Sequence, residues 1–327
     1  MTRRVCAVLA GMLLLALGAP MQSRPAIAQA VAFPTKPITL VVPWPAGGPT
    51  DRHLRLLAEI AGKHLGQSVI VDNKPGATGT MGGALMAGTA KPDGYTIAQL
   101  PLTIFRLPYM QKTSWDPKKD FSFIIHLTGY TLGVTGHADN PWKTWAEFLA
   151  YAKANPNAVR YASSGAASTP HITMEQIAHR LGIKWTHVPF KGDAENGAAL
   201  LGKHVEVAAT GTGLAGLIDA GQARMLVVWT EQRSPRFPDS PTLRESGIDI
   251  VSASPYGLAG PRGMDPKVMK ILHDAFEKAL HDPTHLKMLT DLSQPVMYMN
   301  SADYAKYAMQ QIAEQQEMIA MLGLGQK

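Results

Sequence analysis

Short hydrophobic runs alternate with helix-type patterns in the first part of the chain. They predict strands at 38–42, 68–71 and 95–100, and helices at 52–65 and 81–90. In the first helix the apolar positions repeat at helical spacing, at Leu54, Leu57, Ala58, Ala61 and Leu65. This alternation predicts right-handed βαβ units around a parallel sheet, with the repeating apolar residues in its core.

A second series of the same kind follows. The elements expected here are strands at 132–135, 159–162, 185–188, 205–209 and 225–229, and a helix that opens with a capping box from Thr144 to Glu147. The last part of the chain shows only a strand near 256–259 and helices from about Asp265 and Ser301. This is too little sheet for a third domain, so we expect it to pack on the first lobe.

The patterns therefore predict an α/β fold of two lobes with a cleft between them. A length of 327 residues suits two domains, and 46% hydrophobic with 17% charged residues is typical of a globular protein. Lobe one is expected to comprise 29–130 and 252–327, and lobe two 131–251. The two crossovers are expected near 128–132 and 250–254.

The N-terminus is typical of a secretory signal peptide. Arg3 and Arg4 precede an apolar stretch at 5–19, and small residues end at Ala28, after which we expect cleavage. The apolar stretch is shorter than the roughly 20 residues that a spanning helix needs. The arginine pair also allows the twin-arginine route, but the general secretory route is favoured because Cys6 and Ala7 stand where hydrophobic residues usually follow. The expected location is the periplasm.

Removal of the signal changes the interpretation of composition and charge. Cys6 is the only cysteine, so the mature protein is expected to have no disulfide and no thiol chemistry. Loss of Arg3, Arg4 and Arg24 lowers the net charge from +6 to +3. Because the remaining basic residues form no cluster, nucleic-acid binding is not expected. The charge is compatible with a small anionic ligand.

Two loops follow strands and precede helices, the places where parallel sheets bind ligands. The first reads PWPAGGPTD at 43–51, and the second reads YASSGAASTPH at 161–171. Glycines let backbone N–H groups approach an anion, and a helix N-terminus adds partial positive charge. Ordinary turns would look similar, with Thr50 or Asp51 as one N-cap and Thr169 before Pro170 as the other. Two such loops, one per lobe, suit a clamp that closes on a carboxylate.

These loops and six further motifs resemble the Bordetella uptake gene family, the receptors of tripartite tricarboxylate transporters. The further motifs are VDNKPGA at 71–77, PDGYT at 92–96, WDPKKDF at 115–121, HVPFKG at 187–192, RSP at 233–235 and PDSPT at 238–242. The resemblance runs from about Phe33 to the C-terminus. It implies a type II periplasmic-binding-protein (Venus flytrap) fold, a small carboxylate ligand, a membrane permease as partner, and a monomer.

The resemblance also implies ligand-binding residues. In the first loop they are Ala46, Gly47, Gly48, Thr50 and Asp51, and in the second Ser163, Ser164, Gly165, Ser168 and His171. Asp51 would repel a carboxylate, so it is assigned to water, to loop geometry or to an amine on the ligand. Lys191 and Thr212 are added from neighbouring motifs. Ala167 replaces a common glycine, and Pro255 a common aromatic residue.

A third cleft loop is expected at 101–106, and it lacks the polar residues common in the family. Thr103 and Arg106 are its candidates. An arginine fork binds carboxylates in a bidentate manner, so Arg106 could pair with a second ligand carboxylate, although a solvated surface arginine is the simpler interpretation.

Other functional classes receive less support. GTGLAG at 211–216 matches G-x-G-x-x-G and is followed by Glu231, which allows an exported dinucleotide-binding oxidoreductase. The motif stands alone, late in lobe two, in a protein expected in a compartment poor in that cofactor. G-x-S-x-G, H-E-x-x-H and Cys/His clusters do not occur, so no catalytic residue, cofactor or metal is expected. A carboxylate sensor without a dedicated permease remains an alternative.

Overall fold

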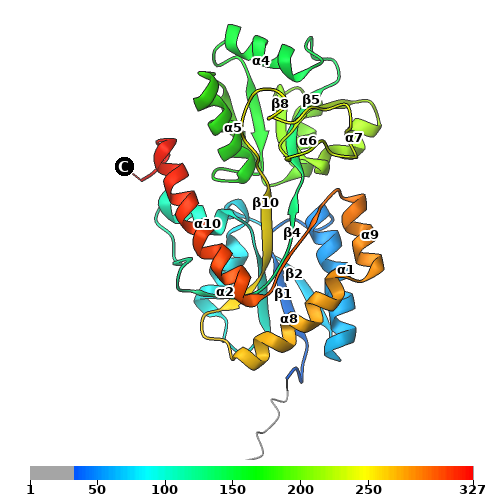
Figure 1. Cartoon of the computed structure of the whole chain (residues 1–327), viewed down its shortest axis with the longest axis vertical. Coiled ribbons are helices and arrows are strands. Elements are labelled where there is room, and N and C mark those ends of the chain that lie inside the picture. Colours follow the sequence, from blue (N-terminus) through cyan, green and yellow to red (C-terminus); the bar gives the residue numbers. More distant parts are fainter. Residues whose placement is uncertain (1–32, 327) are drawn as a thin grey trace, which may run out of the picture. The chain divides into compact units, whose positions relative to one another are not determined.

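The computed structural model describes residues 33–326, so the predicted signal peptide lies outside the described residues. These residues belong to one compact unit that contains two sheets, each covered by helices (Figure 1). The predicted α/β fold of two lobes is confirmed. Between residues 33 and 326 no helix combines the length and the apolar character that crossing a membrane requires.

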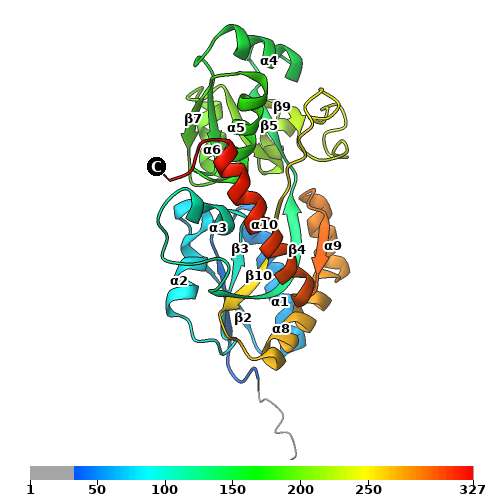
Figure 2. The ribbon, with the colours of Figure 1, turned by 60° about the vertical axis from the view of Figure 1, so that its left-hand side comes forward.

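The first lobe is built on a six-stranded sheet in the order β11-β4-β10-β3-β1-β2. Its strands are β1 (Ile38–Val42), β2 (Val69–Asn73), β3 (Thr96–Leu100), β4 (Phe121–Tyr130), β10 (Ser254–Pro261) and β11 (Val296–Met299). One face is covered by α1 (Pro49–Leu65), α8 (Pro266–Leu280) and α9 (Pro283–Asp291). The other is covered by α2 (Met81–Thr89), α3 (Thr103–Arg106) and α10 (Ser301–Met321), with short turns η1 (Ala77–Gly79) and η2 (Leu107–Tyr109). Figure 2 shows α10 lying across the strands of this sheet.

The second lobe is built on a five-stranded sheet in the order β7-β6-β8-β5-β9. Its strands are β5 (Leu132–His137), β6 (Arg160–Ser163), β7 (Thr186–Pro189), β8 (Val207–Gly211) and β9 (Ala223–Val228). The helices α4 (Trp145–Ala154) and α5 (Thr169–Leu181) pack on one face. On the other face lie α6 (Asp193–Leu201) and α7 (Ala215–Asp219), with the turn η3 (Thr212–Leu214). The predicted capping box at Thr144 is present.

The parallel sheet expected from the first series of strands is confirmed for those strands, but each complete sheet is mixed. Strands β1, β2 and β3 are parallel, and so are β6, β7 and β8. The strands β4, β10 and β11, like β5 and β9, join the sheets in antiparallel pairs. Alternation of strands and helices along the sequence predicts only parallel βαβ units. Strands β5 and β10 instead follow the two connections between the sheets, and this is why the alternation did not predict their direction. The sequence analysis also missed β4, β11 and α9.

The connections between the two sheets lie beside each other. Only Thr131 separates β4 from β5. On the return, the chain enters β10 at Ser254, which pairs with Tyr130 at the end of β4. This antiparallel pair therefore brings both crossings, and the side chains of Tyr130 and Ser254, to the region between the sheets.

A buried polar chain fixes α1 against β10 and α9. His53 is fully buried, its Nε2 contacts the Tyr256 hydroxyl, and its Nδ1 lies 3.3 Å from Nε2 of His285. The Tyr256 hydroxyl also lies 2.9 Å from the side-chain oxygen of Gln294. Burial, together with the nearby His285, lowers the pKa of His53 to about 3, so this imidazole is neutral in the folded protein at neutral pH.

Replacement of His53 should flatten the pH dependence of stability. Folding lowers the pKa of His53 from 6.5 to about 3. Between these two pH values the unfolded chain therefore binds a proton at His53, whereas the folded chain does not. The associated stability is complete above pH 6.5 and is lost as the pH falls towards 3, by about 1.4 kcal/mol per pH unit for one histidine. We expect His53→Gln to be less stable at pH 7 but to lose less stability by pH 4.5 in urea unfolding. His64→Gln, exposed on the same helix, is the control. Equal pH slopes for His53→Gln and the unchanged protein would contradict this.

Candidate functional site

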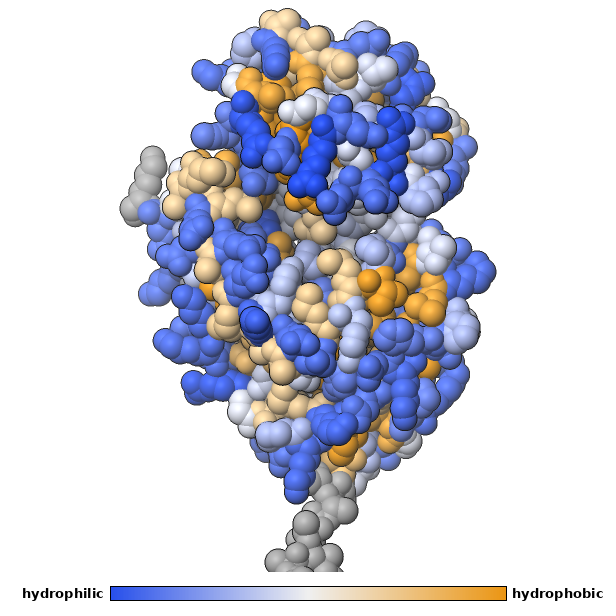
Figure 3. All heavy atoms as spheres, viewed as in Figure 1, coloured by the Kyte–Doolittle hydropathy of each residue, from blue (hydrophilic) through white to orange (hydrophobic). Residues whose placement is uncertain are grey.

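A cleft of about 850 Å³ lies between the two sheets and is lined by residues of both lobes. In the view of Figure 3, mostly hydrophilic residues cover the two lobes, and weakly polar residues gather at the waist between them. Nine of the predicted site residues line the cleft: Ala46, Gly47, Gly48, Thr50, Thr103, Ser164, Ser168, Lys191 and Thr212. Five do not: Asp51, Arg106, Ser163, Gly165 and His171.

The first loop leads from β1 into α1, and its helix begins earlier than expected. Gly48 is the N-cap and Pro49 the first helical residue, so neither Thr50 nor Asp51 caps the helix. Proline at the first position lacks only an N–H that would have no helical partner, and its fixed φ suits the turn. Gly47 adopts φ of 82°, which favours glycine. The first-turn amides of α1, free of helical partners, therefore begin at the wall of the cleft.

Asp51 lies behind this loop. Its side chain is nearly fully buried and accepts hydrogen bonds from the Gly47 amide (2.8 Å), Asn73 Nδ2 (2.8 Å) and Arg55 Nε (2.9 Å). Burial raises the pKa of Asp51, but the hydrogen bonds from Arg55, Gly47 and Asn73 outweigh burial and lower it below its usual value. Of the roles considered for Asp51, these contacts favour loop geometry.

The second loop leads from β6 into α5. Ser168, rather than Thr169, is the N-cap, and its Oγ accepts from the His171 amide at 3.3 Å. Thr169 is the first helical residue, with Pro170 after it. Ala167 has a φ of 63°, so the residue that stands in place of a common glycine occupies the left-handed region at a cost in strain.

Ser163 and His171 support the second loop from behind. Ser163 Oγ lies 2.7 Å from His187 Nε2, and His171 Nδ1 accepts from the Ala167 amide at 3.1 Å. The rings of His171 and His187 stack with their centroids 4.1 Å apart. Burial, with smaller contributions from His187 and Arg106, lowers the pKa of His171 to about 3, so it carries no charge to the cleft at neutral pH.

The segment expected to be a third cleft loop is helical from Thr103 to Arg106. Arg106 is 1% exposed and donates to the Ala167 carbonyl (3.3 Å) and to Thr169 Oγ1 (3.4 Å). It is therefore not a solvated surface residue but a buried link from the first lobe to the second loop. Burial lowers its pKa to about 9. Its pairing with a ligand carboxylate stays a prediction.

Several lining residues were not expected from the sequence, because their positions depend on chain crossings and long-range contacts. They are Trp44, Tyr130, Thr131, Asp193, Ser254 and Gln294. Tyr130 ends β4, which was not predicted, and its hydroxyl lies 2.7 Å from Thr50 Oγ1. A signal for Asp193 was present in the sequence, since an acidic residue directly follows the HVPFKG motif.

The glycines at 211–216 have packing roles of their own. A Cβ at Gly211 would lie 2.0 Å from the Thr131 carbonyl oxygen, and one at Gly213 would lie 1.9 Å from Asp193 Oδ2. The helix that follows, α7, has only five residues. The glycines thus permit close approach of neighbouring chain segments. Residues 210 to 213 line the cleft, and Thr212, expected there from the sequence, is among them.

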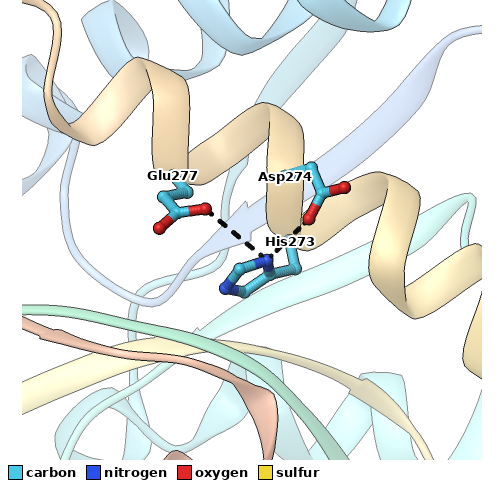
Figure 4. A group of neighbouring side chains, drawn as sticks. All are labelled: His273, Asp274 and Glu277. Carbon is cyan, nitrogen blue, oxygen red and sulfur yellow. Dashed lines mark hydrogen bonds and ion pairs between the residues drawn. The ribbon is translucent and has the colours of Figure 1, made fainter.

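A group of possible metal ligands lies on α8, apart from the residues that line the cleft (Figure 4). His273 Nδ1 is 3.0 Å from Asp274 Oδ1 and 4.0 Å from Glu277 Oε2, and its Nε2 is 3.1 Å from the Tyr298 hydroxyl. Asp274 is also paired with Lys270 at 2.7 Å. The side chains of this group thus bind one another and their neighbours, which accounts for their proximity.

Comparison with known proteins agrees with this architecture. Residues 53–324 match the model of the tripartite tricarboxylate transporter family receptor. A Cupriavidus necator protein, described as a UPF0065 protein in the gbd 5′ region, is 47% identical over 300 residues, which cover 92% of this chain and 91% of the relative.

Solved structures show the same fold over nearly the whole chain. The periplasmic binding protein BugD has a TM-score of 0.84 and 28% identity, covering 90% of this chain and 100% of its own. An R. palustris protein with adipate has a TM-score of 0.83 and 26% identity, covering 90% and 99%. MatC from Rhodopseudomonas palustris with bound malate has a TM-score of 0.81 and 27% identity, covering 88% and 100%.

Removal of the Asp51 charge should destabilise the first loop. Asp51→Asn cannot accept at both oxygens and loses its ion pair with Arg55, so we expect about 1.5–3 kcal/mol less stability in urea unfolding at pH 7. Folding lowers the pKa of Asp51. Its contribution to the stability of the folded protein is therefore complete above the pKa of the unfolded chain and is lost as the pH falls through the lower pKa of the folded chain. Glu59→Gln, which breaks an exposed pair on the same helix, should cost less than about 0.5 kcal/mol. Equal losses in the two variants would contradict this role.

Proposed function

Because this chain belongs to the family of tripartite tricarboxylate transporter receptors, we propose that it captures a small carboxylate outside the cytoplasm and delivers it to a membrane permease of that transporter type. The observation that carries the proposal is the meeting of two strand-to-helix loops, one from each lobe, at a single cleft. The function proposed is binding and transport, with no catalytic step.

The two loops supply the donors that a carboxylate needs. Helices α1 and α5 both begin at the cleft, where Gly48 and Ser168 are the N-caps. The first-turn amides of α1 and the Thr169 amide of α5, with the helix dipoles, favour an anion there; in α5, Pro170 has no N–H and the His171 amide donates to Ser168 Oγ. The hydroxyls of Thr50 and Ser168 also line the cleft, and that of Ser168 donates to Ser163 Oγ at 3.4 Å. Glycines at 47 and 48 leave room for the ligand to approach the backbone.

The relatives support the ligand class. The structures with adipate and malate contain dicarboxylates, and both align with nearly the whole of this chain. We therefore propose a mono-, di- or aromatic carboxylate as the ligand, bound by the fourteen residues expected from the sequence. Of these, Asp51, Arg106, Ser163, Gly165 and His171 do not line the cleft in this structure and would act from behind its wall unless the ligand reaches Arg106. Periplasmic location after signal cleavage and a monomeric state belong to the same proposal.

Closure of the two lobes would bury the ligand. We propose that 29–130 with 252–327 and 131–251 move as two bodies about the paired crossings at Tyr130 and Ser254. Arg106 contacts Thr169 from the other lobe, and Thr50 contacts Tyr130 at the end of β4, beside the first crossing. The closed form would then be the one that docks on the permease.

A methyl group added at Gly48 should block the carboxylate without disturbing the fold. Gly48 has an ordinary φ of −69°, and a Cβ there would meet only the Pro45 carbonyl oxygen at 3.5 Å. We expect Gly48→Ala to weaken binding at least about tenfold, which corresponds to about 1.4 kcal/mol. Gly88→Ala, where a Cβ meets nothing within 4 Å, is the matched control.

The measurement is a thermal-shift screen of the mature protein against mono-, di- and tricarboxylates, followed by calorimetry of the hits. A ligand at about 100 times its Kd adds roughly 2.7 kcal/mol of stability. Absence of any carboxylate hit, or equal affinity of Gly48→Ala and Gly88→Ala for the ligand found, would overturn the proposal.

A further inference from the structure

Two parts of the cleft lining differ in hydrogen-bonding character. One is formed by the starts of α1 and α5 and offers donors. The other contains Thr131, Thr212 and Asp193, which are neighbours: the Thr212 amide donates to the Thr131 carbonyl, and Gly213 lies against Asp193. What these groups can still donate or accept, once their internal hydrogen bonds are made, decides which ligand end suits this side.

Two threonine hydroxyls on this side have already used their protons. Thr212 Oγ1 donates to the Leu292 carbonyl at 2.9 Å, and Thr131 Oγ1 donates to the Ser293 carbonyl at 2.5 Å. A hydroxyl has one proton and two acceptor lone pairs, so each oxygen can only accept from a ligand. Both residues line the cleft, and this side therefore presents acceptors.

Asp193 adds an anionic acceptor. It is the first residue of α6, lines the cleft and lies against Gly213, where the absence of a Cβ leaves space for the carboxylate. Burial raises the pKa of Asp193 to about 6, and only the Asn196 side chain counteracts this, so no cation among the described residues compensates the carboxylate. At neutral pH it is mostly ionised.

An unused hydroxyl lies beside these groups. Thr210 lines the cleft, is 1% exposed, and its Oγ1 has no hydrogen-bond partner among the described residues. In strand β8, Thr210 lies on the same face as Ala208. Ala208 packs on Ala199 and Leu200 of α6, the helix that begins at Asp193. Buried polar groups are normally paired, so an unpaired hydroxyl in a cleft indicates a place for a ligand atom.

We propose that Asp193, with the acceptor oxygens of Thr131 and Thr212, binds a protonated amine on the ligand, so that the cleft selects an amino-carboxylate over a dicarboxylate. This inference rests on the proposed carboxylate capture and specifies the other end of the ligand. A second carboxylate placed here would meet the ionised Asp193 and the Thr131 and Thr212 oxygens, whose protons are already donated, and of the described groups beside them only the Thr210 hydroxyl could still donate to it. The cations that line the cleft, Arg52 and Lys191, are exposed and stand at its rim.

The test compares pairs of ligands in which a protonated amine takes the place of the second carboxylate or, in the last pair, of a hydroxyl. Calorimetry at pH 7.5 would pair γ-aminobutyrate with succinate, δ-aminovalerate with glutarate, ε-aminocaproate with adipate, and L-aspartate with L-malate. We expect at least one amino-carboxylate to bind about tenfold or more tightly than its partner. Asp193→Asn should remove that preference by weakening the amine ligand and leaving or improving its partner.

Acid should weaken amine binding to the unchanged protein about tenfold between pH 7.5 and 5, because protonation of Asp193 neutralises it. The titratable or charged groups around it are Tyr130 from β4, Arg52 from α1, and Lys191 and Glu195 from its own segment. Glu195→Gln is the matched control, since Glu195 is exposed at the rim and accepts from the Lys191 amide. It should keep both the preference and its pH dependence.

The outcomes separate this inference from the proposed function. Tight binding of dicarboxylates that Asp193→Asn leaves unchanged would overturn the amine assignment and leave carboxylate capture standing. Failure of all eight compounds and of the wider carboxylate panel would overturn both. An amine preference that survives in Asp193→Asn would also overturn the assignment to Asp193.

Discussion

The antiparallel pairing of β4 with β10 is the constraint on which the arrangement of the site depends. These two strands carry the chain from one sheet to the other and back, and they pair up to Tyr130 and Ser254 at the cleft. Because the crossings are adjacent, the ends of β1 and β6 face a common space, and the loops that follow these strands can reach one ligand. In the proposed closure, the ladder hydrogen bonds would confine bending to residues beside Thr131 and Ser254.

A second layer of contacts holds the binding loops in shape without taking part in the cleft. Asp51 ties the Gly47 amide to Asn73 and Arg55, while Ser163, His171 and His187 support the loop before α5. Burial keeps the pKa values of His171 and His187 near 3 and 4, so their support does not depend on charge at neutral pH. The groups left for the ligand are then mainly backbone amides and hydroxyls, whose positions are set before binding.

The sequence was sufficient for most of the elements and for the two loops, because both are local, although β4, β11 and α9 were not predicted. The stripe at Leu54, Leu57 and Ala61 identifies α1, and glycines and prolines before it mark a loop at a strand end. Strand direction does not depend on local sequence. Strand β10 is antiparallel because the chain returns from the other sheet, and no short stretch of sequence indicates that return. The same holds for Arg106, whose burial depends on contacts with Ala167 and Thr169, more than sixty residues away.

The packing of Gly213 against Asp193 means that the ligand selectivity proposed for this cleft depends on a residue that offers the ligand no side chain. A Cβ at 213 would lie 1.9 Å from Asp193 Oδ2, so any side chain there would require the carboxylate to move. A substitution at 213 would thus relocate the acid, and with it the proposed selectivity, while Asp193 itself is kept.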